Sequence, residues 1–433
     1  MTHEEILKAD KDFIWHPFTP LQSPFEHISI KSAKGAKLFT HDGKTIIDAV
    51  SSWWVNIHGH SNEKIAKAIY DQAMTMEHVI FAGFTHEPAA KLATNLMKIL
   101  PEGYSKIFFS DNGSTSIEVA LKMAFQYWYN QDKKHKTKII ALNGAYHGDT
   151  FGAMSVGERG GFTEPFFPFL FDFESLDFPT DENFEQVLAH FDQLTSDEKC
   201  AAFIFEPLVQ GAGGMRMYKP EQLDQLVALA QKKGIICIAD EVMTGWGRTG
   251  KKLACDHIKS HPDITCLSKG ITGGTLPLGI TACNAKIEDA FQSGELTKAL
   301  LHGHSYTGNP MICAAANASF EIFQSDECQN NIQRIHEKHQ GFIKRLETFD
   351  NTENIRCQGT IVAFDMKGFG ETGYDSAARK KIYPYFLERG VLIRPLGNVI
   401  YLLPPYVISN DELDFVYDLI IEFLTEMKKE LNQ

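Results

Sequence analysis

Between residues 104 and 285 the chain contains a series of short apolar runs, separated by amphipathic stretches. Most of the runs are apolar without interruption, as expected for strands covered on both faces. Between them, residues 115–129 and 222–232 have the period of crossover helices. The pattern predicts an α/β domain with a large, mostly parallel sheet, whose strands we expect at residues 105–110, 137–142, 200–207, 234–242, 263–269 and 278–283.

The pattern changes near residue 324, where a long charged helical stretch is followed by short strand-like runs. This change predicts a smaller α+β domain over residues 325–433, after a large domain over residues 51–324. Residues 1–50 contain short strand-like runs of their own, and we expect them to pack with the small domain. The aromatic and proline-rich residues 164–179 are expected to form a loop.

Charge and composition narrow the class of function. The chain has 42 lysines and arginines against 55 aspartates and glutamates, a net charge of -13 without a basic stripe, which disfavours nucleic acid and anionic membranes as partners. An acidic start and short apolar runs argue against a signal peptide or membrane span. The eight cysteines lack a CxxC pair, which favours reduced thiols and a cytoplasmic location. His16, His58 and His60 lack ligand spacing, so no metal is predicted.

Two charged residues end neighbouring expected strands. Lys269 follows an apolar run in TCLSKGITGG, and Asp240 ends the run GIICIAD. A lysine there either extends to solvent or is used chemically, because burying an ammonium group is costly. A carboxylate there can bind a metal, accept a proton or pair with a cationic ring nitrogen. The metal is disfavoured because no second cluster of ligands accompanies Asp240.

Two further strand ends offer binding groups. The backbone amides of Gly113, Ser114 and Thr115 open a helix and are positioned to hold a phosphate, although the same residues also suit an ordinary helix cap. Tyr146, beside His147, either stacks on a flat ring or fills a loop. A phosphate cup, an aromatic ring, an aspartate and a lysine at one sheet edge match the requirements of pyridoxal 5'-phosphate (PLP), with Lys269 as the Schiff-base lysine and Asp240 as the partner of the pyridine nitrogen.

Three motifs extend this interpretation to a family. FIFEPLVQGAGGM, ICIADEVMTGWGRTG and LSKGITGGTLPLG resemble the class III aminotransferases of fold-type I. The resemblance implies the roles given above for Lys269, Asp240, Gly113, Ser114 and Tyr146. It also implies that His304 and Ser305, in HGHSYTGNP, reach the cofactor of a partner subunit, and hence a homodimer with shared active sites.

Further motifs resemble the biotin-pathway branch of this class: IWHPFT, SSWWVNIHGH, GAYHGDTFGAMSVG and RPLGNVIYLLPPY. That resemblance implies 8-amino-7-oxononanoate as acceptor, S-adenosyl-L-methionine as donor and transfer of an amino group in two half-reactions. Arg394 suits the acceptor carboxylate. Adjacent strand residues face opposite ways, so we expect one of the paired tryptophans to contact ligand, and choose Trp53. The implied substrate site is completed by Phe18, Tyr146, Gly303 and Tyr401.

The sequence leaves alternatives open. Phe18, Asn112 and His304 depart from the family pattern, where tyrosine, serine and proline are usual. The segment GHSYTGN is similar to relatives that use lysine as donor, so lysine remains an alternative. Other possibilities are a class III aminotransferase of ω-amino acids, ornithine or putrescine, an aminomutase, or a non-catalytic cofactor-binding relative. Arg248 is either a surface residue or a contact to the donor.

Overall fold

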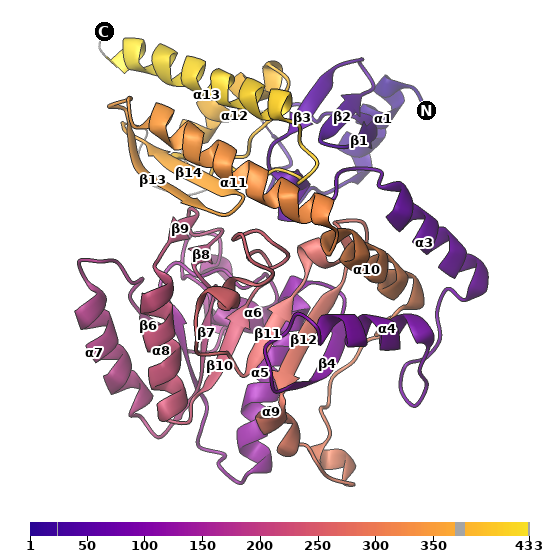
Figure 1. The fold of residues 1–433 in the computed structure, drawn as a ribbon, viewed down its shortest axis with the longest axis vertical. Coiled ribbons are helices and arrows are strands. Elements are labelled where there is room, and N and C mark those ends of the chain that lie inside the picture. The colour runs from indigo at the N-terminus through magenta and orange to yellow at the C-terminus, as the bar shows by residue number, and fades with distance from the viewer. Residues whose placement is uncertain (24, 369–376, 432–433) are drawn as a thin grey trace.

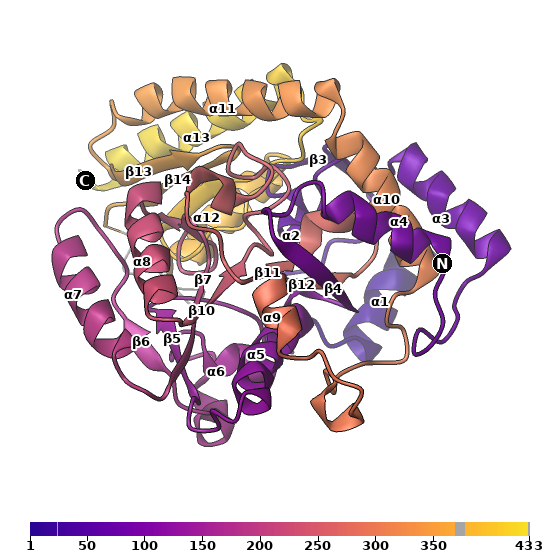
Figure 2. The same ribbon diagram turned by 60° about the horizontal axis from the view of Figure 1, so that its bottom comes forward.

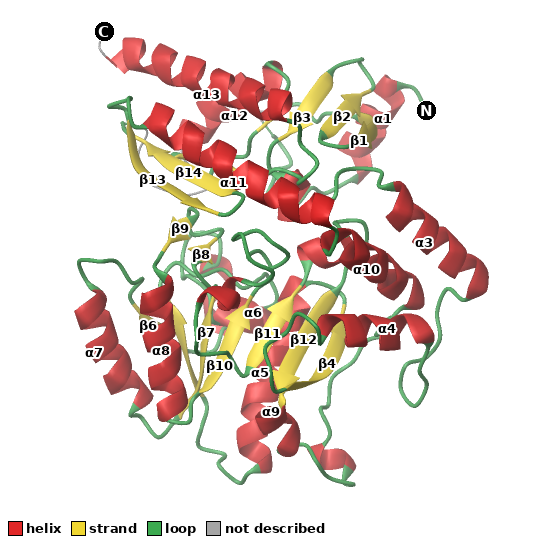
Figure 3. Cartoon of the chain, in the orientation of Figure 1, coloured by secondary structure: helices red, strands yellow, loops and turns green. Residues whose placement is uncertain are grey.

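The computed structural model describes residues 1–23, 25–368 and 377–431. A seven-stranded sheet in the order β4-β12-β11-β10-β7-β5-β6 forms its centre (Figures 1 and 3). Its strands are β4 (Tyr104–Ser110), β5 (Lys138–Leu142), β6 (Glu174–Leu176), β7 (Cys200–Phe205), β10 (Ile236–Asp240), β11 (Ile264–Leu267) and β12 (Gly279–Asn284).

The sheet confirms the predicted α/β class. Strands β11, β10, β7, β5 and β6 are parallel neighbours, whereas β12 is antiparallel to both β11 and β4. All six expected strands are present, with ends shifted by up to two residues. The loop prediction for residues 164–179 is wrong in part, because the edge strand β6 and the 3-10 helix η1 (Glu164–Phe169) lie within it.

The uninterrupted apolar runs are explained by burial on both faces. Along β5 and β7, alternate residues enter different clusters: Ile140 and Phe203 pack on one face, Ile139 and Ala202 on the other. Helices α7 (Phe184–Thr195) and α8 (Pro220–Lys232) cover the first face, and α5 (Gly113–Asn130) with α6 (Phe151–Ser155) covers the second (Figures 1 and 2). The sheet is therefore a buried layer whose strand ends are the places left for polar groups.

Two smaller sheets lie beside the large one. The first is the three-stranded sheet β13-β14-β16. Helices α11 and α13 lie side by side along one of its faces (Figure 1). In the four-stranded sheet β1-β2-β3-β15, strand β15 of the C-terminal part pairs in parallel with β3 of the N-terminal part. These elements are β1 (Ile30–Lys34), β2 (Lys37–Thr40), β3 (Thr45–Asp48), β13 (Thr352–Gln358), β14 (Ile361–Met366), β15 (Val391–Leu392), β16 (Val399–Leu402), α11 (Asp326–Leu346) and α13 (Asn410–Leu431).

The first 50 residues therefore join a sheet with the C-terminal part, while the division at residues 50 and 324 stays a prediction. The remaining elements are α1 (His3–Phe13), α2 (Ser51–Trp54), α3 (Glu63–Thr75), α4 (Glu87–Leu96), β8 (Val209–Gln210), β9 (Arg216–Met217), η2 (Ala254–His257), η3 (Lys269–Thr272), α9 (Ala285–Asp289), η4 (Leu296–Lys298), α10 (Pro310–Phe323) and α12 (Ala377–Glu388). None of the helices in the described ranges is long and apolar enough to span a bilayer.

Candidate active site

Four polar side chains gather at the carboxyl edge of the large sheet. Strands β11, β10, β7 and β5 are adjacent and parallel, so the residues that follow them meet at one edge. His147 follows β5, Glu206 follows β7, Asp240 ends β10, and Lys269 lies two residues beyond β11. The chain thus brings together two carboxylates, an imidazole and an amine from positions more than 120 residues apart.

Lys269 is half-buried and not exposed, so the prediction that it serves chemistry is favoured over an escape to solvent. Its Nζ lies 4.5 Å from the centre of the Trp54 ring, and no carboxylate in the described ranges comes within ion-pair distance. Burial lowers the pKa of Lys269 to about 8, against the opposing effect of Asp240 and Glu206. Its backbone φ of 46° lies in the left-handed region, which costs a lysine about 1–3 kcal/mol and is typical of functional sites. An amine in this environment is readily made nucleophilic.

Asp240 is held by two hydrogen bonds. Its Oδ2 lies 2.7 Å from Nδ1 of His147, and its Oδ1 accepts from the backbone N–H of Val242 at 3.1 Å. Both side chains of the pair are buried. Nε2 of His147 is also buried and has no partner among the described residues. The carboxylate is therefore fixed in position, and its charge suits a further cationic partner, which a pyridinium nitrogen would provide.

Glu206 is a site residue that the sequence prediction missed. Its Oε1 accepts from the backbone N–H of Tyr146 at 3.1 Å, and its Oε2 accepts from that of Gly211 at 2.9 Å. Burial raises the pKa of Glu206 to about 7. The signal for it was a carboxylate directly after the buried run FIF in a quoted motif. Glu206 thus fixes the loop that carries Tyr146, whose ring is partly exposed beside the site.

The phosphate cup is smaller than the sequence predicts. Thr115 N–H is not available, because it donates to Oδ1 of Asn112, the N-cap of α5, at 3.0 Å. The backbone amides of Gly113 and Ser114 have no acceptor in the described chain. A Cβ added to Gly113 would lie 2.8 Å from Cγ1 of Val242, so close approach requires glycine there. Ser114 Oγ accepts from Asp149 N–H at 3.2 Å. Two amides and a hydroxyl at a helix N-terminus still suit a phosphate.

The expectation that only one of Trp53 and Trp54 contacts ligand assumed that both lie in a strand, and that assumption is wrong. Trp53 and Trp54 lie in the irregular helix α2, where Trp53 has φ -126° and ψ 58°, and not in a strand. Both rings therefore contact site residues: Trp54 lies against Lys269, and Trp53 lies 4.2 Å below the guanidinium carbon of Arg394. Trp54 was not among the predicted site residues.

Arg394 has the features expected of a carboxylate receptor. It is half-buried and stacked on Trp53, its Nε is buried without a partner, and no carboxylate of the described chain pairs with it. The ring of Phe18 lies 5.8 Å from that of Trp53, which places Phe18 at the same wall. Tyr401 is buried in β16, and its hydroxyl accepts from Nε1 of Trp54 at 2.9 Å. Tyr401 thus supports Trp54 as well as lying near the predicted substrate site.

Some predicted residues do not join this group. Gly303, His304 and Ser305 lie in a partly exposed turn before α10, and no contact joins them to Lys269 in the described chain. The suggestion that Arg248 is a surface residue is wrong. Its guanidinium is fully buried and donates to the carbonyl oxygens of Pro404 at 2.8 Å and Trp54 at 3.5 Å. Arg248 therefore holds the turn that carries Trp54 in place.

A half-buried lysine, a buried aspartate and a glycine-led helix N-terminus at one edge of this sheet are the groups that PLP-dependent enzymes of fold-type I require. The chain belongs to the class III aminotransferases, because the model of that family matches residues 20–424.

Two relatives carry the name of one particular aminotransferase. The adenosylmethionine-8-amino-7-oxononanoate aminotransferase of Synechococcus elongatus is 48% identical over 96% of this chain and 99% of its own. The enzyme of the same name from Helicobacter pylori is 35% identical over 98% of this chain and 99% of its own.

Solved structures agree with these relatives. The crystal structure of the enzyme of that name from Methanocaldococcus jannaschii superposes with a TM-score of 0.92 at 34% identity, covering 98% of this chain and 99% of that one. A PLP-bound amine transaminase from an uncultivated Pseudomonas species superposes with a TM-score of 0.86 at 30% identity, covering 95% and 97% of the two chains.

Proposed function

We propose that this protein is a PLP-dependent aminotransferase that converts 8-amino-7-oxononanoate into 7,8-diaminononanoate in biotin synthesis, with S-adenosyl-L-methionine as the amino donor. Relatives of this name match over nearly the whole chain at up to 48% identity. The observation that carries the chemistry is the half-buried Lys269, packed on Trp54 at the sheet edge that also holds Asp240 and His147.

The residues at the sheet edge fit PLP by their own chemistry. Gly113 and Ser114 would bind the phosphate, and Asp240 would keep a proton on the ring nitrogen, held in place by His147. Lys269 would hold the cofactor covalently. When bound, PLP supplies a carbonyl that condenses with amines and a ring that accepts electron density from the reacting carbon.

The side chains around the cofactor site have separate roles in transfer of the amino group. With the cofactor bound, Nζ of Lys269 would remove the proton from the donor Cα and, in the second half-reaction, would deliver a proton to the carbon of the acceptor that receives the amino group. Its pKa of about 8 suits a group that both takes and gives a proton near neutral pH. Trp54 and the buried Arg248 behind it exclude water from the amine. Arg394 binds the carboxylate of the acceptor, and Trp53 with Phe18 lines the path of its alkyl chain.

A product assay tests the proposed function. The PLP-loaded protein is incubated with 8-amino-7-oxononanoate and either S-adenosyl-L-methionine, lysine or ornithine, and the diamine is measured by mass spectrometry. We expect product with S-adenosyl-L-methionine and none without a donor, which also separates transamination from an aminomutase. Product with lysine but not with S-adenosyl-L-methionine would show that lysine is the donor. Absence of product with every donor would show that 8-amino-7-oxononanoate is not the acceptor.

Arg394→Leu should raise KM for 8-amino-7-oxononanoate by roughly 10- to 100-fold, because charge-assisted hydrogen bonds contribute about 1.5–3 kcal/mol. The KM of Arg394→Lys should lie between those of Arg394→Leu and the wild type, because lysine keeps the positive charge but lacks the planar guanidinium group. The matched control is Arg389→Leu, an exposed arginine stacked on Tyr385 at 3.7 Å and away from Lys269. An unchanged KM in Arg394→Leu would show that the acceptor carboxylate binds elsewhere.

A homodimer with shared sites is also proposed. Support comes from the exposed turn at residues 303–305, which contacts no Lys269 site in its own chain, and from large apolar side chains at the surface, among them Phe13, Trp15 and Leu301. Where such side chains gather into a contiguous patch, they mark subunit interfaces.

Co-expression of two inactive variants tests the sharing of sites. Lys269→Ala lacks the amine, and Ser305→Asp places a negative charge against the phosphate of the partner's cofactor. Hybrid dimers would contain one intact site, so a 1:1 mixture should regain about one quarter of wild-type activity. A mixture as inactive as its two components would mean that Ser305 serves the site of its own chain, and an active Ser305→Asp variant would mean that it serves no site.

A further inference from the structure

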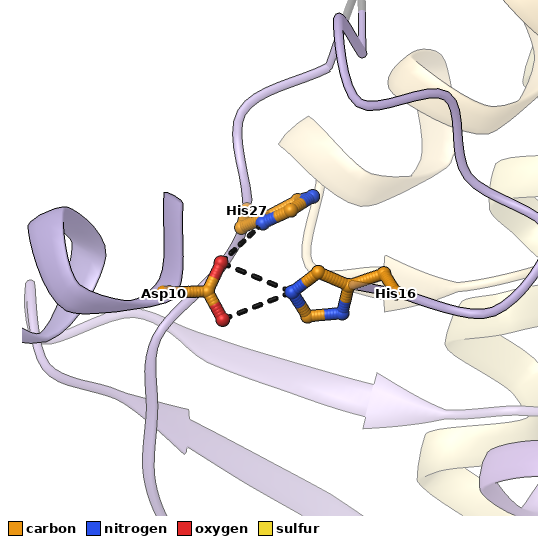
Figure 4. A group of neighbouring side chains, drawn as sticks. All are labelled: Asp10, His16 and His27. Carbon is orange, nitrogen blue, oxygen red and sulfur yellow. Dashed lines mark hydrogen bonds and ion pairs between the residues drawn. The ribbon is translucent and has the colours of Figure 1, made fainter. Parts of the chain in front are cut away.

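Three side chains from the N-terminal part form a cluster that the proposed reaction does not use. Asp10 lies in the last turn of α1, His16 follows that helix, and His27 precedes β1 (Figure 4). Figure 4 shows both imidazole rings directed at the carboxylate of Asp10 from opposite segments of the chain. The sequence predicts no metal site, because His16 lacks ligand spacing to His58 and His60, and Asp10 and His27 are not among the predicted site residues.

The geometry of the cluster is that of a metal-ligand set. Nε2 of His16 lies 2.9 Å from Oδ1 of Asp10, and Nδ1 of His27 lies 2.5 Å from Oδ2. One ligand atom from each residue can be chosen so that all lie within 4.8 Å of one another. The ligand atoms of a tetrahedral zinc ion lie about 3.3 Å apart, since its bonds to nitrogen and oxygen are about 2.0–2.1 Å long. The contacts from Asp10 to His16 and His27, 2.9 and 2.5 Å, are shorter than this spacing, so the side chains would move apart to admit an ion.

The ligand chemistry selects the ion. Two imidazoles with one carboxylate suit zinc and neighbouring transition metals, whereas magnesium and calcium prefer oxygen ligands alone. The remote ring nitrogens, Nδ1 of His16 and Nε2 of His27, have no hydrogen-bond partner in the described chain and are not buried. Each neutral ring can therefore carry its proton on the remote nitrogen, in contact with water, and direct a lone pair toward the ion.

The cluster is open to solvent and lies close in sequence to a residue of the candidate active site. The side chains of His16 and His27 are 33% and 35% exposed, so an ion can enter from solvent and keep water in its remaining coordination position. His16 lies two residues before Phe18, whose ring packs on Trp53 at the wall of the candidate active site. An ion at the cluster would tie α1 and the stretch before β1 to the segment that carries Phe18.

We propose that Asp10, His16 and His27 form a site for a divalent transition-metal ion of the zinc class, which fastens the N-terminal segment beside the substrate path. The ion is structural in this role and does not take part in amino transfer. Its three protein ligands come from three separate segments, so binding stabilises their mutual arrangement.

Direct binding measurements test the site on the full-length, PLP-loaded protein after treatment with a chelator. Titration calorimetry with zinc chloride should show one ion per chain at micromolar affinity or tighter, and cobalt chloride should give visible ligand-field absorption distinct from that of the cofactor. Asp10→Asn and His27→Gln should each weaken zinc binding at least tenfold, because each removes one of three ligands. His190→Gln, an exposed histidine on α7, is the matched control and should bind as the wild type does.

Three results would overturn the proposal. The first is absence of zinc uptake by the wild type at 0.1 mM or so, a concentration far above that expected for a three-ligand site. The second is unchanged affinity in both ligand variants, which would locate the ion elsewhere. The third is a cobalt spectrum identical to that of the free aqueous ion. The last measurement uses the wild type alone, so it decides the question even where a variant folds poorly.

Discussion

Lys269→Ala should abolish turnover, with kcat reduced by at least about 10⁴-fold, because the variant lacks both the covalent attachment and the proton carrier. Binding of the cofactor should survive in part, since Gly113, Ser114, Asp240 and His147 remain in place. The measurement combines the product assay with the amount of PLP retained after dialysis. Turnover within tenfold of the wild type would contradict the assignment of Lys269.

The control for this variant is Lys199→Ala. Lys199 is exposed and directly precedes β7, so it lies at the amino end of the strand, whereas the site lies at the carboxyl ends. The substitution removes the same side chain without approaching the site, and we expect kcat to stay within about twofold, as is usual for surface changes. A comparable loss in both variants would point to a general effect on folding.

Asp240→Asn should lower kcat by about 10²–10³-fold, the usual effect of removing one group that stabilises charge in the transition state. An amide keeps the shape of the side chain and a hydrogen bond to His147 but loses the negative charge that would hold a proton on the ring nitrogen. The loss should fall on kcat more than on KM, because the charge matters when electron density moves into the ring. The pH dependence of the bound cofactor's absorbance should change in parallel.

A second buried aspartate provides the structural control. Asp263 precedes β11 at the opposite edge of the sheet, where its Oδ2 accepts from the backbone N–H of Cys237 at 2.9 Å. Asp263→Asn should lower the thermal midpoint while leaving kcat and the cofactor spectrum unchanged. Equal losses of kcat in Asp240→Asn and Asp263→Asn would indicate that Asp240 has only a structural role.

The large sheet was predictable because its strands are buried on both faces, and such strands are uninterrupted apolar runs. The residues at their ends followed from the same reasoning, since parallel strands present their carboxyl ends at one edge. Asp240 and Lys269 therefore meet where the sequence predicts. The edge strand β6 was missed because it is only three residues long and follows a proline-rich stretch that is typical of loops.

The residues that were missed depend on contacts between distant segments. Trp54 reaches Lys269 because α2 departs from regular geometry at Ser52 and Trp53, and no period in the sequence predicts such a turn. The Thr115 amide is not free to bind phosphate because it donates to the side chain of Asn112, the N-cap of α5. Asp10 and His27 are 17 residues apart, and only the path of the chain after α1 brings them together.

One active site is proposed to take an amino group from S-adenosyl-L-methionine and to give it to 8-amino-7-oxononanoate. Spectroscopy of the two half-reactions, run separately, is the decisive experiment. S-adenosyl-L-methionine is added to the PLP-loaded protein without acceptor, and 8-amino-7-oxononanoate is added after the spectrum is constant. We predict that the absorbance of bound PLP disappears in the first step and returns in the second. A spectrum unchanged by S-adenosyl-L-methionine, or a change produced by ornithine that 8-amino-7-oxononanoate does not reverse, would contradict the account.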